Sequence, residues 1–332
     1  MGCCCKKKKK KDIKEEQQII IPGLSNFEGN CYLNSILQCF YYCKDLTNYF
    51  IKNEKEINKK KGQLSTAYLK LILMLNKKKK YNDAKILLNA LQEVSYNFFQ
   101  RGGNDPKAVL LYLLENLHNE LKEQNSDYNE EDVCCEDIDQ EEVFQKCKKN
   151  EENNKSIISE LFNWFLLTKY ECKKCNNFHY ICECQNNIII ELNKYKTKEK
   201  EAKLDDLIKY YFKDVEKNFI CDKEMFKVKS TKKIISLPKY LIIILNRNII
   251  QFKVIYDDII DISEYCVNES KAKYEFIGAS FTNDYGNKEG THAISKCITS
   301  EGSYIFNDLI TIKNCNDIEG YNPYILFYKK IQ

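Results

Sequence analysis

The feature that most constrains this chain is a loop-to-helix junction at residues 23–38, which reads GLSNFEGNCYLNSILQ. Gly23 and Gly29 permit a tight loop, and the apolar spacing that follows predicts an amphipathic helix. Cys31 therefore falls in the first turn of that helix, with Asn30 as the expected N-cap. A helix N-terminus favours the reactive thiolate form of a cysteine. The junction predicts a nucleophile at Cys31, although a buried cysteine that caps a core helix would show the same local pattern.

Few residues are available to assist Cys31. Asn26 lies five residues upstream and can aim its side-chain amide at the reaction centre as an oxyanion donor. The chain holds three histidines, His118, His179 and His292, so any mechanism that needs an imidazole has three candidates. His118 falls within an apolar helical stretch beside leucines, which is the usual setting of a structural histidine.

Composition and charge exclude several classes of protein. With 332 residues, 43% of them apolar, the chain can bury the core of one large domain or two small ones. The net charge of +4 includes six lysines at residues 6–11, so the rest of the chain is slightly acidic, which argues against a nucleic-acid binder. Seventeen cysteines without an apolar signal sequence indicate reduced, cytosol-facing thiols rather than a disulfide framework. No apolar run approaches the ~18 residues needed to span a bilayer.

The N-terminus carries a lipidation signal, because the first methionine is followed by Gly2, Cys3, Cys4 and Cys5 and then by the lysine run. Gly2 can be myristoylated and the three cysteines palmitoylated, and each lysine beside an anionic leaflet adds roughly 1 kcal/mol of binding free energy. The myristoylation motif prefers Ser or Thr at the sixth residue, where this chain has Lys6. We expect a tail that holds the protein on the cytosolic face of a membrane; a basic localisation patch is the alternative.

The first half of the chain beyond the tail is mainly helical in pattern. Apolar spacing predicts helices over roughly 31–51, 66–76 and 83–100, and Pro106 suits the first turn of a further helix. Residues 122–155 are polar and acidic, and we expect a surface insertion or a flexible loop there.

The second half of the chain is rich in strand patterns and in cysteines. An apolar segment from Ser156 leads to Cys172 and Cys175, whose C-x-x-C spacing brings two thiols to one metal. Residues 232–247 hold a Leu-Pro turn and a β-branched run that is typical of a buried strand. A further strand, a glycine-containing turn and His292 follow, so this imidazole is expected at the edge of a sheet.

Taken in order, these motifs resemble those of the ubiquitin-specific proteases. The cysteine box of that family runs Gly-Leu-x-Asn-x-Gly-Asn-Thr-Cys-Tyr-x-Asn-Ser-x-Leu-Gln. Residues 23–38 match it except at residues 28–30, where Glu-Gly-Asn stands for Gly-Asn-Thr. A Leu-Pro strand, a histidine region and a final strand at residues 322–328 follow in the family's order, so the resemblance covers residues 23–329.

The resemblance implies an α+β, papain-like cysteine protease fold with a helical thumb, a β palm and a β finger extension. The membrane-targeting tail and linker would occupy residues 1–22 and the catalytic domain residues 23–330. Within that domain the acidic insertion lies at about 122–155 and the finger region at about 168–230. The implied activity is thiol-dependent hydrolysis of isopeptide and peptide bonds at the C-terminus of ubiquitin. Ubiquitin and ubiquitinated proteins would be the partners, and catalysis would need no cofactor.

The resemblance also assigns roles to single residues. Cys31 would attack the carbonyl carbon, and His292 would act as the base and later as the acid. Asn307 would hold the imidazole in the right tautomer, with Asp308 as the alternative. Asn26, together with the backbone N–H of Cys31, would stabilise the tetrahedral oxyanion.

Two boxes depart from the family pattern. A carboxylate at Glu28, close to the nucleophile, would oppose a thiolate. The family has Gly-His-Tyr at the histidine, whereas here Thr291 precedes His292, Ala293 follows it and Gly290 is displaced by one place. One alternative is therefore a catalytically impaired, ubiquitin-binding member of the family. Another is a thiol enzyme of different specificity, such as a transglutaminase or a protease for another ubiquitin-like modifier.

The finger region of the family carries a second C-x-x-C pair, and together the two pairs bind a structural zinc. In this chain Cys221 supplies the first cysteine of the second pair, and Glu224 replaces the other. Cys172, Cys175 and Cys221 are thus three candidate zinc ligands. The alternatives for the fourth ligand are His179, Cys182 and Cys184.

Overall fold

The computed structural model describes most of the chain beyond its first twenty residues. The described residues are 21–27, 29–60, 62–79, 82–95, 105–123, 134–137, 139–195, 199–221, 224–247, 252–267, 271–283, 292–313, 318 and 320–331. The expected lipidation sites Gly2 and Cys3 to Cys5 lie outside them, as do Glu28, Gly290 and Thr291.

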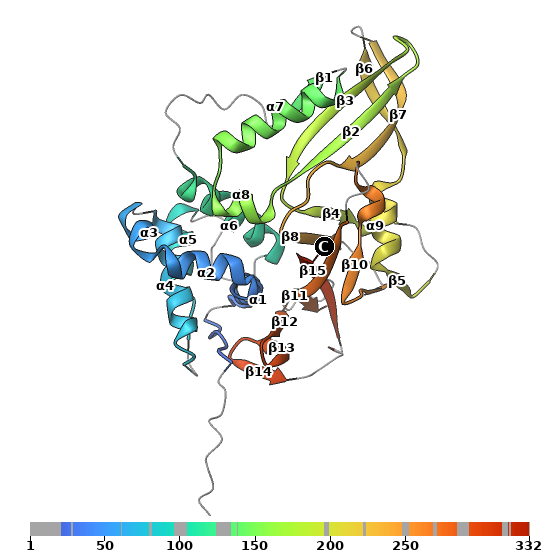
Figure 1. Cartoon of the computed structure of the whole chain (residues 1–332). Coiled ribbons are helices and arrows are strands. Elements are labelled where there is room, and N and C mark those ends of the chain that lie inside the picture. The colour runs from blue at the N-terminus through green and yellow to red at the C-terminus, as the bar shows by residue number, and fades with distance from the viewer. Residues whose placement is uncertain are drawn as a thin grey trace, which may run out of the picture.

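The thumb is a helical lobe on one side of the molecule (Figure 1). Its helices are α1 (Cys31–Tyr42), α2 (Lys44–Lys52), α3 (Glu54–Lys60), α4 (Gln63–Asn76), α5 (Lys85–Val94), α6 (Pro106–Leu121) and α8 (Ile157–Phe162). Every residue of α1 is buried, so this helix forms the centre of the lobe. Phe40 of α1 stacks on Phe162 at a centroid distance of 5.9 Å and meets Phe327 of the palm edge-on at 6.1 Å. One apolar core therefore joins the thumb to the palm.

The palm is an eight-stranded sheet that packs against α1. Its strands run in the order β14, β13, β12, β11, β15, β8, β4, and β10 pairs with β11. Their bounds are β4 (Ile188–Glu191), β8 (Tyr240–Asn246), β10 (Ile259–Asp261), β11 (Lys273–Asn283), β12 (Ala293–Thr299), β13 (Gly302–Asn307), β14 (Ile310–Lys313) and β15 (Tyr321–Lys330). The hydroxyls of Ser35 on α1 and Ser280 on β11 lie 2.8 Å apart, so the helix that carries Cys31 is bonded to the middle of the sheet.

The fingers are a five-stranded sheet in the order β1, β3, β2, β7, β6, and they extend away from the thumb and palm (Figure 1). Their bounds are β1 (Cys134–Asp137), β2 (Trp164–Cys172), β3 (Asn177–Gln185), β6 (Val215–Cys221) and β7 (Glu224–Ile234). The helix α9 (Leu204–Phe212) and the paired strands β5 (Glu201–Lys203) and β9 (Lys253–Ile255) contribute to a second apolar core. This core also contains buried residues of the palm strands. The strand patterns of the second half of the sequence are therefore confirmed.

Of the two expectations for residues 122–155, a surface insertion or a flexible loop, the flexible loop is wrong from Cys134 onward, where β1 and a helix are formed. Gln140–Asn153 form the helix α7, and the side chain of Asp139 accepts a backbone N–H of its first turn. Val143 and Cys147 bury one face of α7 against the finger strands. Charged residues surround these two apolar positions in the sequence, but a pair spaced by four residues places both on one helical face.

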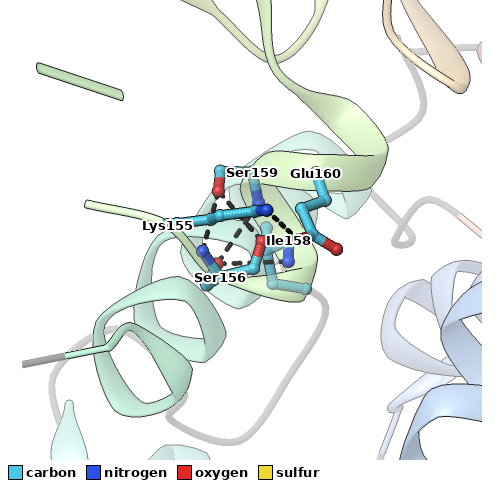
Figure 2. A network of polar contacts seen from close by, with 5 residues as sticks. All are labelled: Lys155, Ser156, Ile158, Ser159 and Glu160. Carbon is cyan, nitrogen blue, oxygen red and sulfur yellow. Dashed lines mark hydrogen bonds and ion pairs between the residues drawn. The ribbon is translucent and has the colours of Figure 1, made fainter. Parts of the chain in front are cut away.

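A capping box begins α8 at the joint between the thumb and the fingers (Figure 2). The Ser156 hydroxyl accepts from the backbone N–H groups of Ile158 and Ser159 at 3.1 and 3.2 Å. In return, Ser159 Oγ accepts from the backbone N–H of Ser156 at 2.9 Å. Ser156 Oγ also lies 2.7 Å from Nδ1 of His118 on α6. His118 thus joins two helices of the thumb, α6 and α8.

The architecture is the α+β, papain-like arrangement of thumb, palm and fingers that the resemblance implied. Across the described ranges, no helix combines the length and the apolarity that crossing a bilayer requires. The candidate catalytic residues come from the start of α1, from the residue before β12 and from the end of β13, where the thumb meets the palm.

Candidate active site

Cys31 is the first residue of α1 and is 5% exposed. Gly29 has a φ of +85°, a left-handed conformation that favours glycine, so the tight loop expected before the helix is present. Asn30 occupies the N-cap position but does not cap the helix, because its Oδ1 accepts from the backbone N–H of Phe27 at 2.7 Å. The first N–H groups of α1 are therefore not taken by this cap, which suits the stabilisation of an oxyanion in front of Cys31.

His292 and Asn307 lie side by side at the end of the palm sheet. Nε2 of His292 and Oδ1 of Asn307 are 2.8 Å apart, so the amide oxygen accepts the Nε2 proton. Asn283 fixes the backbone of His292, because its Oδ1 accepts from the His292 N–H at 2.7 Å. The ring of Tyr321 meets the imidazole edge-on at a centroid distance of 6.3 Å. With Nε2 engaged by Asn307, Nδ1 is the nitrogen left to face Cys31.

The imidazole is electrostatically suited to pair with a thiolate. Its hydrogen bond with Cys31 raises the pKa of His292 to about 9, against burial, which lowers it. The hydrogen bond with Asn307 and the nearby charge of Asp308 act in the same direction as Cys31. These interactions favour the protonated imidazole, which is the form that stabilises a thiolate beside it and gives a proton to a leaving amine.

Asp308 clamps the cysteine loop to the end of β13. Its Oδ1 accepts from Asn34 Nδ2 at 2.8 Å, and its Oδ2 accepts from Asn26 Nδ2 at 2.9 Å. Its backbone oxygen accepts from the Leu24 N–H at 3.0 Å. Asn26 in turn accepts from the Asn30 N–H at 2.9 Å, which extends the clamp to the residue before the nucleophile.

The close approach of the two segments requires glycine at position 23. A Cβ on Gly23 would lie 2.6 Å from the backbone oxygen of Asp308 and 2.8 Å from Cα of Leu309. Asp308 itself has a φ of +53°, which Asp tolerates better than most residues. The strained turn after β13 and the glycine of the cysteine box therefore fit together as one unit.

The sequence and the structure agree on which residues meet, but not on every contact. His292 contacts both Cys31 and Asn307, and Asn26 is hydrogen-bonded to Asp308, the residue after Asn307. The clamp by Asp308 was missed, because sequence reasoning treated it only as an alternative to Asn307. An acidic residue directly after the expected third member of the triad was the single signal for it.

In the fingers, the structure brings together two of the three expected zinc ligands with His179, one of the alternatives. One ligand atom each from Cys172, Cys175 and His179 lies within 4.8 Å of the others, and Cys175 Sγ is 3.3 Å from His179 Nε2. The side chain of Cys221 lies outside the described part of the chain. Glu224 is exposed and pairs with Lys174 at 2.6 Å. Two thiols and an imidazole form a donor set that can hold a zinc ion.

A family model described as ubiquitin carboxyl-terminal hydrolase matches residues 22–328. The chain is 23% identical to ubiquitin carboxyl-terminal hydrolase Usp2 of Drosophila melanogaster, over 93% of its own length and 34% of that protein. It is also 23% identical to ubiquitin carboxyl-terminal hydrolase 4 of Saccharomyces cerevisiae, over 93% of its own length and 39% of the relative. The chain thus spans less than half the length of these two relatives.

Solved structures share the fold. The Ubp8/Sgf11/Sus1/Sgf73 DUB module of SAGA bound to monoubiquitin aligns with a TM-score of 0.71 at 17% identity, over 94% of this chain and 69% of that chain. The same module bound to ubiquitin aldehyde aligns with a TM-score of 0.69, over 96% of this chain and 71% of that chain. The family match covers nearly the whole described structure, from the cysteine loop to the last strand of the palm. The chain therefore belongs to the ubiquitin carboxyl-terminal hydrolases, in the ubiquitin-specific protease group that its cysteine box resembles.

Proposed function

We propose that this protein is a thiol-dependent deubiquitinase that hydrolyses isopeptide and peptide bonds at the C-terminus of ubiquitin. The observation that carries the proposal is the meeting of Cys31, His292 and Asn307 where the thumb joins the palm. Membership of the family and the ubiquitin-bound state of two structural neighbours support ubiquitin as the substrate.

The geometry supports a two-step acyl transfer. Cys31 Sγ attacks the carbonyl carbon, and the imidazolium of His292 gives a proton to the leaving amine as the C–N bond breaks. A water molecule then attacks the thioester, His292 takes its proton, and the thiolate leaves. Asn307 keeps the imidazole oriented through Nε2 during both steps.

The oxyanion would be stabilised by the Cys31 backbone N–H and by Asn26. One N–H of the Asn26 amide is directed to Asp308, so that carboxylate fixes the orientation of the amide. The second N–H of the same NH₂ group is then available to the oxyanion. In this proposal Asn26 is an oxyanion donor that is held in place by Asp308.

An electrophilic ubiquitin probe tests the activity. We expect the wild-type protein to form a covalent adduct with the probe and the Cys31→Ala variant to form none. Absence of an adduct, or an adduct that survives Cys31→Ala, would sink the protease assignment and favour a ubiquitin-binding protein without catalysis. Parallel probes built on other ubiquitin-like modifiers separate a deubiquitinase from a protease of different specificity, because only the preferred modifier should react rapidly.

We further propose a structural zinc ion in the fingers. Cys172, Cys175 and His179 would supply three ligands, and Cys221 is the candidate for the fourth. The test is the zinc content of the purified protein, with Cys175→Ser as the variant and Cys184→Ser as the matched control on the neighbouring strand. About one zinc per chain that is lost only in Cys175→Ser supports the site. Equal zinc content in both variants would refute it.

The last proposal concerns location. We propose that acylation of Gly2 and of Cys3 to Cys5 holds the protein on the cytosolic face of a membrane, with the lysines of residues 6–11 as the second attachment signal. Replacing Gly2 by Ala and the three cysteines by Ser should release the protein into the soluble fraction. Unchanged fractionation would refute the anchor.

A further inference from the structure

The N-terminal end of the described chain lies between two loops of the folded domain. On one side, the backbone N–H of Ser25 donates to Asn82 O at 2.8 Å in the connection between α4 and α5. On the other side, the Leu24 N–H donates to Asp308 O at 3.0 Å in the turn between β13 and β14. In Figure 1 the end of α4 and the strand β14 lie at the lower end of the molecule, where the blue N-terminal end of the coloured chain also lies.

Lysines gather on the same two loops. Lys77, Lys78 and Lys79 follow α4, Lys85 begins α5, and Lys313 ends β14, and all five are exposed. None of these five ammonium groups forms an ion pair with any residue in the described ranges. Positive charge therefore accumulates around the point where the N-terminal tail joins the domain.

Large apolar side chains are exposed beside these lysines. Ile310 and Ile312, which are 61% and 47% exposed, share one face of β14, the last strand at its end of the palm sheet. Ile86, which is 54% exposed, lies next to Lys85 at the start of α5. We call this the basal surface, and its members are Lys77, Lys78, Lys79, Lys85, Ile86, Ile310, Ile312 and Lys313. Lysines around protruding isoleucines form the pattern of an interfacial membrane contact.

We propose that the basal surface lies against an anionic phospholipid bilayer, as a membrane contact of the folded domain that acts beside the lipidated tail. The lysine run at residues 6–11 of the tail is not the occupant, because the basal surface would repel it. A bilayer offers both anionic headgroups for the lysines and apolar chains for the isoleucines. A nucleic acid or an acidic peptide would satisfy only the lysines. Docking in this way would also bring the active centre toward the membrane, since Asn307 directly precedes the turn to β14.

The test uses the full chain made without acyl groups, and vesicles of phosphatidylcholine with and without phosphatidylserine. The variant combines Lys77→Gln, Lys78→Gly, Lys79→Gln and Lys85→Gln. Glycine is chosen at position 78 because Lys78 has a φ of +50°, which glycine adopts without strain. The matched control removes four exposed lysines from α9 and the fingers, and its changes are Lys209→Gln, Lys213→Gln, Lys217→Gln and Lys227→Gln.

We expect the wild-type protein to bind only the vesicles that contain phosphatidylserine. Each lysine near such a surface strengthens binding about fivefold. The basal variant should therefore lose at least tenfold in affinity, and the control variant less than about twofold. Equal binding by the two variants would overturn the proposal, and any membrane affinity would then be attributed to the tail. Hydrolysis of a soluble ubiquitin substrate should be the same in both variants, so this test and the test of catalysis fail independently.

A second experiment tests the exposed isoleucines of the basal surface. Ile86→Ser combined with Ile312→Ser should weaken vesicle binding at high salt, where the charge attraction is screened but apolar insertion is not. Two results together would overturn the bilayer as the occupant and favour a polyanion. The wild-type protein would bind single-stranded RNA as tightly as it binds the anionic vesicles, and the two serine substitutions would have no effect on vesicle binding.

Discussion

The active centre and the tip of the fingers are held together in different ways. At the active centre, hydrogen bonds join the cysteine loop to a turn nearly three hundred residues away, as in the contact of Asn26 with Asp308. At the finger tip, Cys172, Cys175 and His179 come from one hairpin. Besides Cys172 itself, the apolar cluster at the tip has only Phe219 and Val228 as buried members among the described residues. The comparison indicates that reactivity depends on the packing of thumb on palm, whereas the finger tip depends on contacts within one hairpin.

The largest expected contrast comes from the two histidines. His292→Ala should lower kcat/KM by about 10⁴-fold, because the base and the acid of the reaction are lost together. His179→Ala should leave kcat/KM for a minimal fluorogenic ubiquitin substrate within about twofold, since the two sites are distant and share no partner. Steady-state kinetics on both variants checks this. A comparable loss in the two variants would show that finger and active centre are coupled.

The Asp308→Asn substitution tests whether the hydrogen bonds of Asp308 to the cysteine loop support catalysis. Asn tolerates the left-handed turn and keeps one acceptor, but it removes the charge that holds both Asn26 and Asn34. Hydrogen bonds to a charged group contribute about 1.5–3 kcal/mol each, so we expect kcat/KM to fall about 10- to 100-fold.

Asp45→Asn is the matched control for Asp308→Asn. Asp45 also accepts two side-chain hydrogen bonds, from Lys239 and Tyr240, but it lies at the start of α2. Its substitution should lower the free energy of unfolding and leave kcat/KM unchanged. If Asp308→Asn behaved in the same way, Asp308 would be a structural residue only.

The pH dependence separates the ion pair from the rest of the molecule. The pKa of His292 is raised to about 9 in the folded protein, above the ~6.5 of an unfolded chain. Its contribution to stability is therefore complete below pH ~6.5 and is lost as the pH rises through about 9. Kcat/KM should fall across the same alkaline range as the imidazolium loses its proton. Denaturant unfolding and kinetics between neutral pH and pH 10 check both effects, and His292→Gln should abolish the change in stability.

The sequence was informative where a contact is local or where a motif carries it. The glycines and the apolar spacing around Cys31 placed the nucleophile at a helix start without any long-range information. The partnership of Cys31 with His292 and Asn307 came from the resemblance alone, because no local pattern relates residues so far apart. The clamp by Asp308, the helix α7 and the basal surface were missed, since each depends on side chains that only the folded chain brings together.

Removal of zinc tests the finger tip directly. A chelator should lower the midpoint of thermal unfolding of the wild-type protein, because a structural metal contributes binding free energy only to the folded state. The His179→Ala variant should respond less to the chelator, and Cys184→Ser should respond as the wild type does. Differential scanning fluorimetry with and without the chelator measures the shift. No shift in the wild type would indicate that packing of Phe219 and Val228 alone holds the tip.

The smallest expected effect is at Glu28, which lies outside the described residues beside the left-handed Gly29. Glu28→Gly should raise kcat/KM by roughly threefold, because removing a nearby carboxylate removes its repulsion of the thiolate. Glu28→Gln removes the charge but keeps the side chain, so an equal gain in both variants would assign the effect to electrostatics. A gain in Glu28→Gly alone would assign it to the backbone of the loop. Since Gly29 already supplies the positive φ that the turn needs, we expect the charge to account for the difference, and unchanged kinetics in both variants would contradict that expectation.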